Sequence, residues 1–299
     1  MMRVAVTGAS GLIGTALVAA LRADGHQVVR LVRGQSTKPA PDEVRWNPQA
    51  GYVDLDGLAG VDGVVHLAGA GVGDRPWTPA RKRVIRDSRV DGTRTIATAL
   101  TQLDPKPNVL VSASAIGYYG DSGDTEVDET SPPGEGFLAS VVVDWEAAAA
   151  PARAAGIRVA HPRTGLVMTR RGGILPKLAL PFKLGLGGRL GSGRQYSSVI
   201  SLADEVAALQ ALLIDDSVEG AVNLCCPQPL TNADFTTALA RAIGKPARLM
   251  VPGLLLGRTE QTREMLLFGQ RARPAVLERR GFAFAHQDAE SVIDWALAN

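Results

Sequence analysis

The sequence predicts an α/β fold, with a doubly wound parallel sheet and a smaller α+β part at the C-terminal end. Short apolar runs alternate with stretches of helical periodicity up to about residue 165. The first run, Val4 to Val6, leads directly into a glycine-rich turn and then into a helical pattern. From Leu166 onward this alternation ends and glycine-rich stretches appear. Because right-handed crossovers join alternating strands and helices, the first part is expected to build one parallel sheet.

The N-terminal turn carries three glycines, spaced as Gly8-x-x-Gly11-x-x-Gly14. Between a strand and a helix, this spacing indicates a dinucleotide-binding turn, as in Rossmann-like domains. Gly8 allows the tight turn, Gly11 lets the backbone approach a pyrophosphate, and Gly14 lets the helix pack closely on the strand. The helix N-terminus offers free N–H groups and partial positive charge to phosphate. The cofactor contacts expected here are Gly8, Ser10, Gly11, Leu12, Ile13 and Gly14. The alternative is a tight turn without a ligand.

The end of the second strand, expected at Gln27 to Val32, indicates which cofactor the chain prefers. The adenosine ribose of a dinucleotide lies at this strand end, where an acidic residue would bind the ribose hydroxyls and repel a 2′-phosphate. The sequence has Val32 here, followed by Arg33. A guanidinium in place of a carboxylate favours NADP(H) over NAD(H). The alternative interpretation of Arg33 is a surface arginine in a loop.

The remaining elements of the first part follow from the same patterns. We expect a loop at Thr37 to Pro48 with a short strand at Val44 to Trp46, a turn or short helix at Asp54 to Gly60, a strand at Val61 to Ala70, a helix at Trp77 to Leu103, a strand at Asn108 to Ser112, an acidic surface loop at Asp121 to Gly136, a helix at Phe137 to Ala155 and a strand at Gly156 to Ala160. The strand at 61–70 ends in Ala68, Gly69 and Ala70, small residues that leave room for a ligand. His66, inside that strand, is interpreted as a core histidine rather than a catalytic one.

The sequence divides into two expected domains. Residues 1–165 would form the NADP-binding domain, with 201–222 packing back on it, and residues 166–299 the substrate-side and small C-terminal domain. In the second part we expect helices at Ile174 to Leu184, Ser201 to Leu213, Thr231 to Ile243 and Asp288 to Leu297, and a strand at Ala221 to Leu224. The glycine-rich, cationic residues 170–195 suit either closure over a substrate or plain connections.

The composition argues against several classes of binding partner. The net charge is +2 with mixed signs, which argues against nucleic-acid and membrane partners. The two cysteines, Cys225 and Cys226, are adjacent, so neither a disulfide framework nor a metal site is expected. The sequence shows no signal peptide and no 18-residue apolar span, which favours a cytoplasmic protein. The basic residues from Arg81 to Arg86 are interpreted as a solvated helix face.

Several motifs together resemble the extended short-chain dehydrogenase/reductase superfamily. They are the glycine turn, the His-Leu-Ala-Gly strand end, the Ser-Ala-Ser turn before Tyr-Gly, and the Pro162-Arg163 pair after the sixth strand. The chain is more closely similar to an atypical branch called the epimerase family. The landmarks of that branch are Gly117-Tyr118-Tyr119-Gly120, Trp145-Glu146, Gly172-Gly173-Ile174-Leu175, Gly185-Leu186-Gly187-Gly188, Gly191 to Gln195 and Gly269-Gln270-Arg271. The resemblance covers the whole chain, including the small C-terminal domain.

The resemblance also shows what is missing. In the superfamily a tyrosine, with a lysine four residues later, transfers the proton while nicotinamide gives or takes hydride. Counting back from Glu146, these positions are Leu138 and Val142, or Phe137 and Val141 after a one-residue slip. Neither pair can move a proton. The family's asparagine on the long helix appears here as Arg89, whereas the family's serine is retained as Ser114.

Candidate replacements lie in the hydroxyl-rich turn after the strand at 108–112. Tyr118 or Tyr119 could be the proton donor, with Arg89 lowering the pKa of the phenol through its positive charge. Arg89 could instead hold the cofactor in place of the lysine, and packing is the alternative role for the tyrosines. The catalytic candidates are Ser114, Tyr118, Tyr119 and Arg89. Further cofactor contacts are expected at Arg33, Leu67, Ala68, Gly69, Arg89, Ser112, Pro162 and Arg163. Arg163 and Arg194 are candidates for binding an anionic or sugar-like substrate, with structural ion pairs as the alternative.

Two functions of different classes remain open from the sequence. The first is an NADP(H)-dependent oxidoreductase or epimerase-like enzyme acting on a small carbonyl, hydroxyl or sugar-like substrate. The second is a catalytically silent NADP(H)-binding module that senses redox state or docks a partner. Ser114 and the paired tyrosines favour the enzyme. The oligomeric state is expected to be a monomer or a homodimer, the latter through the helices at 77–103 and 137–155.

Overall fold

The structure, a computed structural model, describes residues 1–34 and 40–299, so Thr37 to Pro39 of the expected loop lie outside the described residues. The chain forms two compact units. The first unit comprises residues 1–114, 141–162 and 206–221, and the second comprises residues 115–140, 163–205 and 222–299. The division at residue 165 into a cofactor domain and a substrate-side domain stays a prediction.

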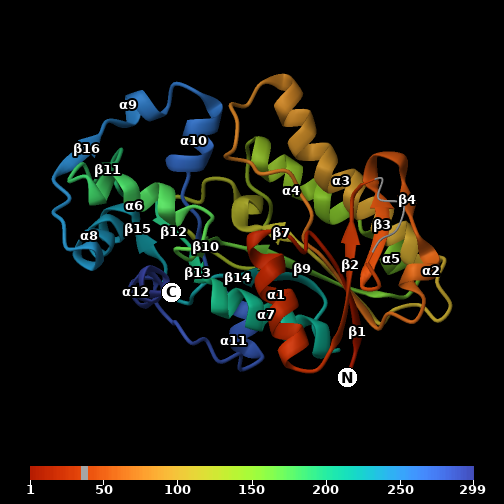
Figure 1. Cartoon of the computed structure of the whole chain (residues 1–299). Coiled ribbons are helices and arrows are strands. Elements are labelled where there is room, and N and C mark those ends of the chain that lie inside the picture. The colour runs from red at the N-terminus through yellow and green to blue at the C-terminus, as the bar shows by residue number, and fades with distance from the viewer. Residues whose placement is uncertain (35–39) are drawn as a thin grey trace. The chain divides into compact units, whose positions relative to one another are not determined.

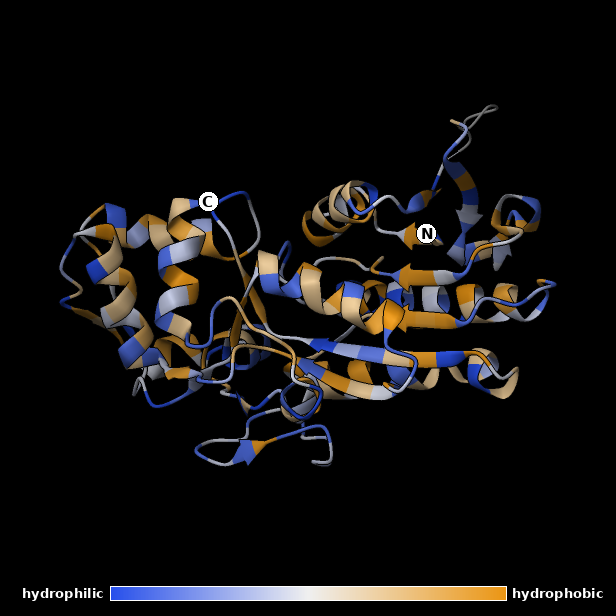
Figure 2. Cartoon of the chain, turned by 90° about the horizontal axis from the view of Figure 1, so that it is seen from below, coloured by the Kyte–Doolittle hydropathy of each residue, from blue (hydrophilic) through white to orange (hydrophobic). Residues whose placement is uncertain are grey.

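A mostly parallel central sheet organises the fold (Figure 1), as the sequence predicts. The strands follow the order β14-β9-β6-β5-β1-β2-β3-β4, with β7 paired to β9. Their bounds are β1 Arg3–Thr7, β2 Gln27–Val32, β3 Glu43–Asn47, β4 Tyr52–Val53, β5 Gly63–His66, β6 Val109–Ser112, β7 Ser114–Ala115, β9 Arg158–Thr164 and β14 Gly220–Leu224. The β1–β2, β1–β5, β2–β3, β5–β6 and β6–β9 pairs are parallel, whereas β3 and β4 pair antiparallel. The central strands are strongly hydrophobic (Figure 2), as expected for a sheet buried on both faces.

The register aligns the carboxyl ends of the central strands. Thr7 at the end of β1 lies opposite His66 at the end of β5, and His66 lies opposite Ser112 at the end of β6. On the other side of β1, Val32 at the end of β2 lies opposite Arg45 on β3. The segments that follow these residues therefore emerge along one edge of the sheet, where ligands bind in open α/β folds.

Helices cover both faces of the sheet. In the first unit these are α1 Leu12–Ala23, α2 Leu55–Leu58, α3 Pro79–Thr101 and α5 Ala150–Ala154, with the 3₁₀ turn η1 Pro48–Ala50 beside them. Alternate strand residues such as Ala5, Val29 and Val64 pack with Ile96 and Leu100 of α3 in one buried cluster. On the opposite face lie α1 and α7 Leu202–Ile214 (Figure 1).

The second unit is built from short elements. They are η2 Ile116–Tyr119, β8 Glu126–Val127, β10 Leu166–Met168, α6 Leu175–Lys183, β11 Gly188–Leu190, β12 Tyr196–Ser197, β13 Val199–Ser201, β15 Leu230–Thr231, α8 Asn232–Ile243, β16 Leu249–Val251, α9 Gly253–Leu256, α10 Glu260–Leu266, β17 Arg271–Ala272, α11 Ala275–Arg279 and α12 Ala289–Ala298. Its core joins α6, α8 and α12 around Phe182, Leu239 and Ile293. Thr231 caps α8 through its side chain, and Ser201 accepts from the amide of Asp204 at the start of α7.

Three expected elements have different bounds in the structure. The strand expected at Val61 to Ala70 ends at His66, because the amides of Leu67 and Ala68 bond a side chain instead of a neighbouring strand. The single helix expected at Phe137 to Ala155 is wrong: α4 Phe137–Ala147 ends and α5 begins at Ala150. Pro151 explains this break, since it has no N–H to donate to the carbonyl of Ala147 and its ring would clash with that carbonyl in a continuous helix. The strand expected at Gly156 to Ala160 instead runs from Arg158 to Thr164.

Across the described residues, no helix combines the length and the apolar character needed to span a membrane.

Candidate dinucleotide site

The glycine turn between β1 and α1 has the geometry that its sequence predicts. Gly8 has a φ of +66°, a conformation that favours glycine. A Cβ on Gly14 would lie 2.2 Å from the carbonyl oxygen of Gly8, so the helix could not pack this closely with any side chain there. No side chain caps the first turn of α1, and that turn has no acidic residue. Ser10 and Gly11 are exposed, and Leu12 and Ile13 begin the helix. The turn thus presents backbone N–H groups that fit a phosphate.

Thr7 joins this turn to the end of β5. Its Oγ1 accepts hydrogen bonds from the amides of Leu67 (3.1 Å) and Ala68 (3.2 Å) and lies 2.8 Å from His66 Nδ1. Because both lone pairs of the hydroxyl are engaged, Thr7 donates its proton to Nδ1, which leaves His66 neutral with its proton on Nε2. Burial lowers the pKa of His66 to about 4. His66 is therefore a core histidine, as predicted.

A cavity of about 830 Å³ lies within the first unit beside the ends of β2 and β5. Its walls come from the end of β2, from β3 and η1, from the segment after β5 and from α3. The lining residues are Arg33, Gly34, Arg45, Trp46, Asn47, Pro48, Gln49, Tyr52, Ala68, Gly69, Ala70, Gly71, Asp74, Arg81, Val84, Asp87, Ser88 and Asp91. Three of the predicted cofactor contacts, Arg33, Ala68 and Gly69, line this cavity. Its volume suits an adenosine-sized group.

Arg81 corrects one detail of the sequence interpretation. The basic residues of α3 were expected to form a solvated face, but Arg81 lines the cavity and donates through Nη2 to the carbonyl oxygen of Gly71. Its Nε is buried and has no hydrogen-bond partner among the described residues. The position of the Arg81 side chain depends on its hydrogen bond to a backbone carbonyl ten residues earlier, which the helical pattern does not predict.

Arg89 supports the cavity wall. Its Nη1 donates to the carbonyl oxygens of Ala70 (2.9 Å) and Ile85 (3.0 Å), and its guanidinium lies 5.0 Å from the ring centre of Trp145. Burial, with a smaller contribution from the charge of Arg81, lowers the pKa of Arg89 to about 10. These contacts fix the segment after β5 against α3. They also place a cation beside Gly69, where an added Cβ would lie 3.4 Å from Cζ of Arg89.

Two serines lie at the end of β6 and just beyond it. The Oγ of Ser112 is fully buried and has no hydrogen-bond partner among the described residues. Ser114, 4% exposed, donates through Oγ to Oε1 of Glu146 on α4, at 2.6 Å. The hydroxyl and the carboxylate are close enough to exchange a proton with each other.

The paired tyrosines of η2 lie in the second unit and differ in their contacts. Tyr119 donates to Oδ1 of Asn223 (2.7 Å) and accepts from Nη1 of Arg163 (3.0 Å). Burial raises the pKa of Tyr119 to about 12, more than the charge of Arg163 lowers it. The guanidinium of Arg163 lies 3.4 Å from the ring centre of Tyr118, a cation–π contact. The positive charge beside these neutral phenols thus comes from Arg163, which is 4% exposed in β9. The neighbouring Pro162 is also buried, in the first unit.

The positions of the missing tyrosine and lysine are apolar and packed. Val142 is 4% exposed, and Leu138 is partly buried at the start of α4. Glu264 of α10 accepts from the amides of Phe137 (2.8 Å) and Leu138 (2.9 Å). A buried carboxylate thereby caps the helix at the place where the superfamily's tyrosine would stand.

Arg194, predicted as a substrate contact, lies on the surface of the second unit. It forms an exposed ion pair of 2.8 Å with Asp124. Its predicted role in substrate binding stays a prediction.

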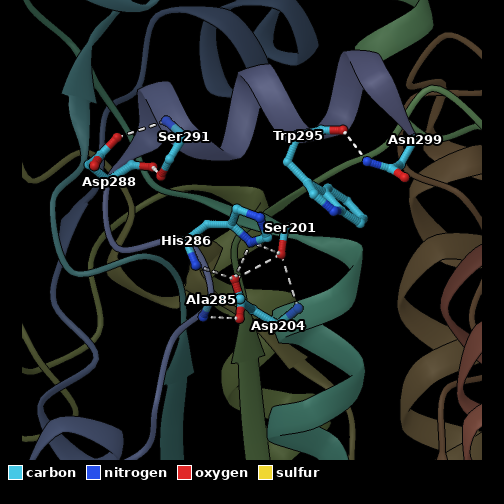
Figure 3. Close-up of polar contacts among 8 residues, drawn as sticks. All are labelled: Ser201, Asp204, Ala285, His286, Asp288, Ser291, Trp295 and Asn299. Atoms are coloured by element: carbon cyan, nitrogen blue, oxygen red, sulfur yellow. Dashed lines mark hydrogen bonds and ion pairs between the residues drawn. The ribbon is translucent and has the colours of Figure 1, made fainter.

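The second unit also contains a serine, a histidine and an aspartate in contact (Figure 3). Asp204 accepts from Ser201 Oγ (2.8 Å) and from the amides of Ala285 and His286. Nδ1 of His286 lies 2.9 Å from Asp204 Oδ2 and 3.0 Å from Ser201 Oγ. A hydrolytic triad needs the hydroxyl and the carboxylate on different ring nitrogens, whereas here both approach Nδ1. The cluster therefore anchors residues 285 and 286 to the start of α7.

Within residues 1–34 and 40–299, no group of three or more His, Cys, Asp or Glu side chains is arranged to hold a metal ion. Cys225 and Cys226 are both buried free thiols.

Comparison with known proteins decides the family. Residues 4–225 match the NAD dependent epimerase/dehydratase family, and residues 250–296 match the domain of unknown function DUF1731. The chain belongs to this epimerase/dehydratase family. The predicted resemblance to an atypical short-chain dehydrogenase/reductase is thus confirmed, together with the Rossmann-like fold.

Full-length relatives share both parts of the chain. An epimerase family protein of Mycobacterium bovis is 46% identical over 98% of this chain and 97% of its own. A crystal structure of human epimerase family protein SDR39U1 with NADPH has a TM-score of 0.87 and 31% identity, and the match covers all of both chains. A Corynebacterium glutamicum structure described as a nucleoside-diphosphate sugar epimerase has a TM-score of 0.82 and 36% identity. The match covers 99% of this chain but only 58% of that one. Distant neighbours such as the Thermus thermophilus UDP-glucose 4-epimerase, at 20% identity, share the fold.

Sequence reasoning missed two residues of the site in this epimerase family member. The sequence predicts only a short strand around Arg45, and it uses Glu146 only to locate the positions of the missing tyrosine and lysine. Arg45 could have been found by pairing β3 with the end of β2, because that register places it beside Val32. The contact of Glu146 with Ser114 spans 32 residues and carries no local signal.

Proposed function

We propose that this chain binds NADP(H) in its first unit and is an oxidoreductase or epimerase-like enzyme for a small carbonyl, hydroxyl or sugar-like substrate. One observation carries the proposal: the first unit contains both the glycine turn at Gly8 to Gly14 and the cavity beside Arg33. The turn fits a pyrophosphate and the cavity fits the adenosine. The presence of NADPH in the human relative supports the same cofactor here.

Preference for NADP(H) over NAD(H) follows from the end of β2. At this position a protein that prefers NAD would carry a carboxylate to bind the ribose hydroxyls. This chain has Val32 there, and the next residue is Arg33. Arg33 is exposed and lines the cavity, so its guanidinium is accessible to a 2′-phosphate. Because related folds with NAD are also known, this preference rests on these residues and not on the fold.

Proton handling is assigned to Ser114 and Glu146. Bound nicotinamide supplies or accepts hydride. Ser114 follows β6 at the sheet's ligand edge, and its hydroxyl contacts the Glu146 carboxylate. As a carboxylate, Glu146 can take the proton that Ser114 passes on from a substrate hydroxyl; as a carboxylic acid, it can return a proton through Ser114 to a substrate carbonyl.

The contacts of the tyrosines favour Tyr118 over Tyr119 as a further substrate contact. The hydroxyl of Tyr119 both donates and accepts within a buried network, and its raised pKa opposes proton release. Tyr118 keeps a partly exposed ring against Arg163. Arg163 therefore orients the tyrosines, and Arg89 supports the cofactor cavity.

The second candidate function is a catalytically silent NADP(H)-binding module that senses redox state or docks a partner. Leu138 and Val142 favour it, since an apolar, packed pair at the usual acid/base positions cannot transfer a proton. Both candidates require the cofactor, so they differ only in turnover.

Titration with NADPH and NADH tests cofactor binding, using the fluorescence of the reduced nicotinamide. We expect NADPH to bind more tightly than NADH, and Arg33→Ala to reduce this preference. Equal binding of both by the wild type would contradict the preference, and absence of binding would contradict the proposal.

A screen of carbonyl substrates with NADPH then separates the two candidates. Turnover that is lost in Ser114→Ala supports the enzyme. Cofactor binding without turnover of any sugar, aldehyde or ketone in the screen supports the silent module.

A further inference from the structure

Arg45 carries a buried donor that nothing in the structure explains. Its Nε lies out of contact with solvent and has no hydrogen-bond partner among the described residues. Burying an N–H of a charged guanidinium without an acceptor is costly, so such donors are usually paired with protein, water or ligand. Arg45 also lines the 830 Å³ cavity, which places its unused donor beside a space large enough for a ligand.

The strand register brings Arg45 next to Arg33. Arg45 lies opposite Val32 in the parallel β2–β3 pair, and Arg33 is the residue after Val32. The two arginines therefore extend from adjacent strands at the same edge of the sheet. Both line the same cavity, although twelve positions separate them in the chain.

The other charges of this region are already paired. Arg30 and Arg22 bind Asp42, at 3.0 Å and 2.6 Å. The three carboxylates of the cavity, Asp74, Asp87 and Asp91, each have an arginine of α3 within 4 Å: Arg81, Arg86 and Arg94, respectively. Among the described residues, no carboxylate lies within ion-pair distance of Arg33 or Arg45. The cavity thus has an excess of positive charge on its β2–β3 side.

We propose that Arg45 and Arg33 together form a phosphomonoester subsite that binds the adenosine 2′-phosphate, with Arg45 as its main ligand. This rests on the proposed binding of NADP(H) in the same unit. Arg45 offers Nε and a terminal nitrogen side by side, the fork that binds two phosphate oxygens at once. Its position on a strand holds this fork in place, whereas Arg33 is exposed and adds a second positive charge to the wall of the same cavity. Cofactor preference is therefore determined by two residues, of which the one on β3 contributes more.

Calorimetric titration of the full chain with three nucleotides tests the subsite without any catalysis. The probes are 2′,5′-ADP and 5′-AMP, which differ only in the 2′-phosphate; 3′,5′-ADP tests the position of that phosphate. We expect the wild type to bind 2′,5′-ADP at least about tenfold more tightly than either of the others, since hydrogen bonds to charged groups are worth roughly one to two decades in affinity.

The decisive variant is Arg45→Met, which removes the guanidinium but keeps most of the side chain. It should bind 2′,5′-ADP at least about tenfold more weakly and 5′-AMP as before. Arg33→Met should lose less. Arg22→Met is the matched control, an arginine of the same unit already paired with Asp42, and it should not change either affinity. Arg45→Met removes an unpaired buried donor, so its thermal unfolding should not occur at a lower temperature than that of the wild type.

The outcomes separate this inference from the proposed function. If the wild type prefers 2′,5′-ADP and Arg45→Met keeps that preference, the role of Arg45 is refuted while NADP(H) binding stands. If 3′,5′-ADP binds as tightly and depends equally on Arg45, the subsite is not selective for the 2′-position and the inference is wrong. If no nucleotide binds the folded wild type, both the inference and the proposed function are refuted.

Discussion

Ser114 and Glu146 are joined by a hydrogen bond of 2.6 Å between a hydroxyl that is 4% exposed and a carboxylate on α4. A bond to an ionised acceptor in a buried setting is stronger than one between neutral groups. The pair thus links the end of β6 to α4 and also offers a route for a proton.

Replacement of Glu146 should test the contribution of this bond to stability. Glu146→Gln keeps an oxygen acceptor for Ser114 and should change the free energy of unfolding by less than about 1 kcal/mol. Glu146→Ala leaves the Ser114 hydroxyl buried without its acceptor and should cost about 1–3 kcal/mol. Urea unfolding measures both, with the exposed Glu219→Ala as control. Equal losses in the two variants would contradict a structural contribution of this bond.

The two tyrosines of η2 should respond differently to removal of the hydroxyl. Tyr119→Phe breaks the bonds to Asn223 and Arg163 and should destabilise the fold by about 1–3 kcal/mol, because buried partners lose their hydrogen bonds. Tyr118→Phe keeps the ring that contacts Arg163 and should change stability by less than about 1 kcal/mol. Denaturant unfolding of the two variants provides the comparison. A larger loss for Tyr118→Phe would reverse the assignment of the buried network.

His66 should make the fold less stable in mild acid. Its pKa is lowered by burial to about 4 in the folded state, against 6.5 when unfolded. Between these values the unfolded chain binds a proton that the folded chain does not, so the free energy of unfolding falls as the pH falls from 6.5 to 4. The loss is roughly 3 kcal/mol for this one group. Urea unfolding at several pH values should show a shallower fall in His66→Asn; an identical fall would mean that His66 is not the group responsible.

Glu205 should act in the opposite direction. Burial raises its pKa to about 8 in the folded state from 4.5, although Thr164 donates to it. Between pH 4.5 and 8 the folded chain keeps a proton that the unfolded chain has released, so stability falls as the pH rises. The loss is on the order of 4 kcal/mol by pH 8. Glu205→Gln, neutral at every pH, should be more stable than the wild type at pH 8 and should lose this dependence. A steeper decline in the variant would contradict the argument.

Local chemistry explains which parts of the fold were predictable. Gly8, the core role of His66, and the capping side chains of Ser201 and Thr231 follow from short patterns in which one residue has one suitable conformation or partner. The break between α4 and α5 also has a local cause, Pro151, which the apolar periodicity of the stretch obscured.

The rest of the site depends on pairing between distant segments. Arg45 reaches the cavity only because β3 aligns with the end of β2, and Tyr119 meets Asn223 across 104 residues. Neither relation leaves a mark in the neighbouring sequence. Side-chain partners of this kind are set by register and burial, which a reading of single segments does not supply.

The contact between Gly14 and the Gly8 carbonyl oxygen affects how the glycine turn is interpreted across related proteins. A methyl group at Gly14 would collide with backbone whether or not a dinucleotide is present, since the obstacle is 2.2 Å away within the protein itself. Any chain that keeps this helix against this strand must keep that glycine for folding alone. A relative that had lost its cofactor could therefore retain all three glycines, and the arginines that line the cavity beside β2 and β3 would better indicate whether binding persists.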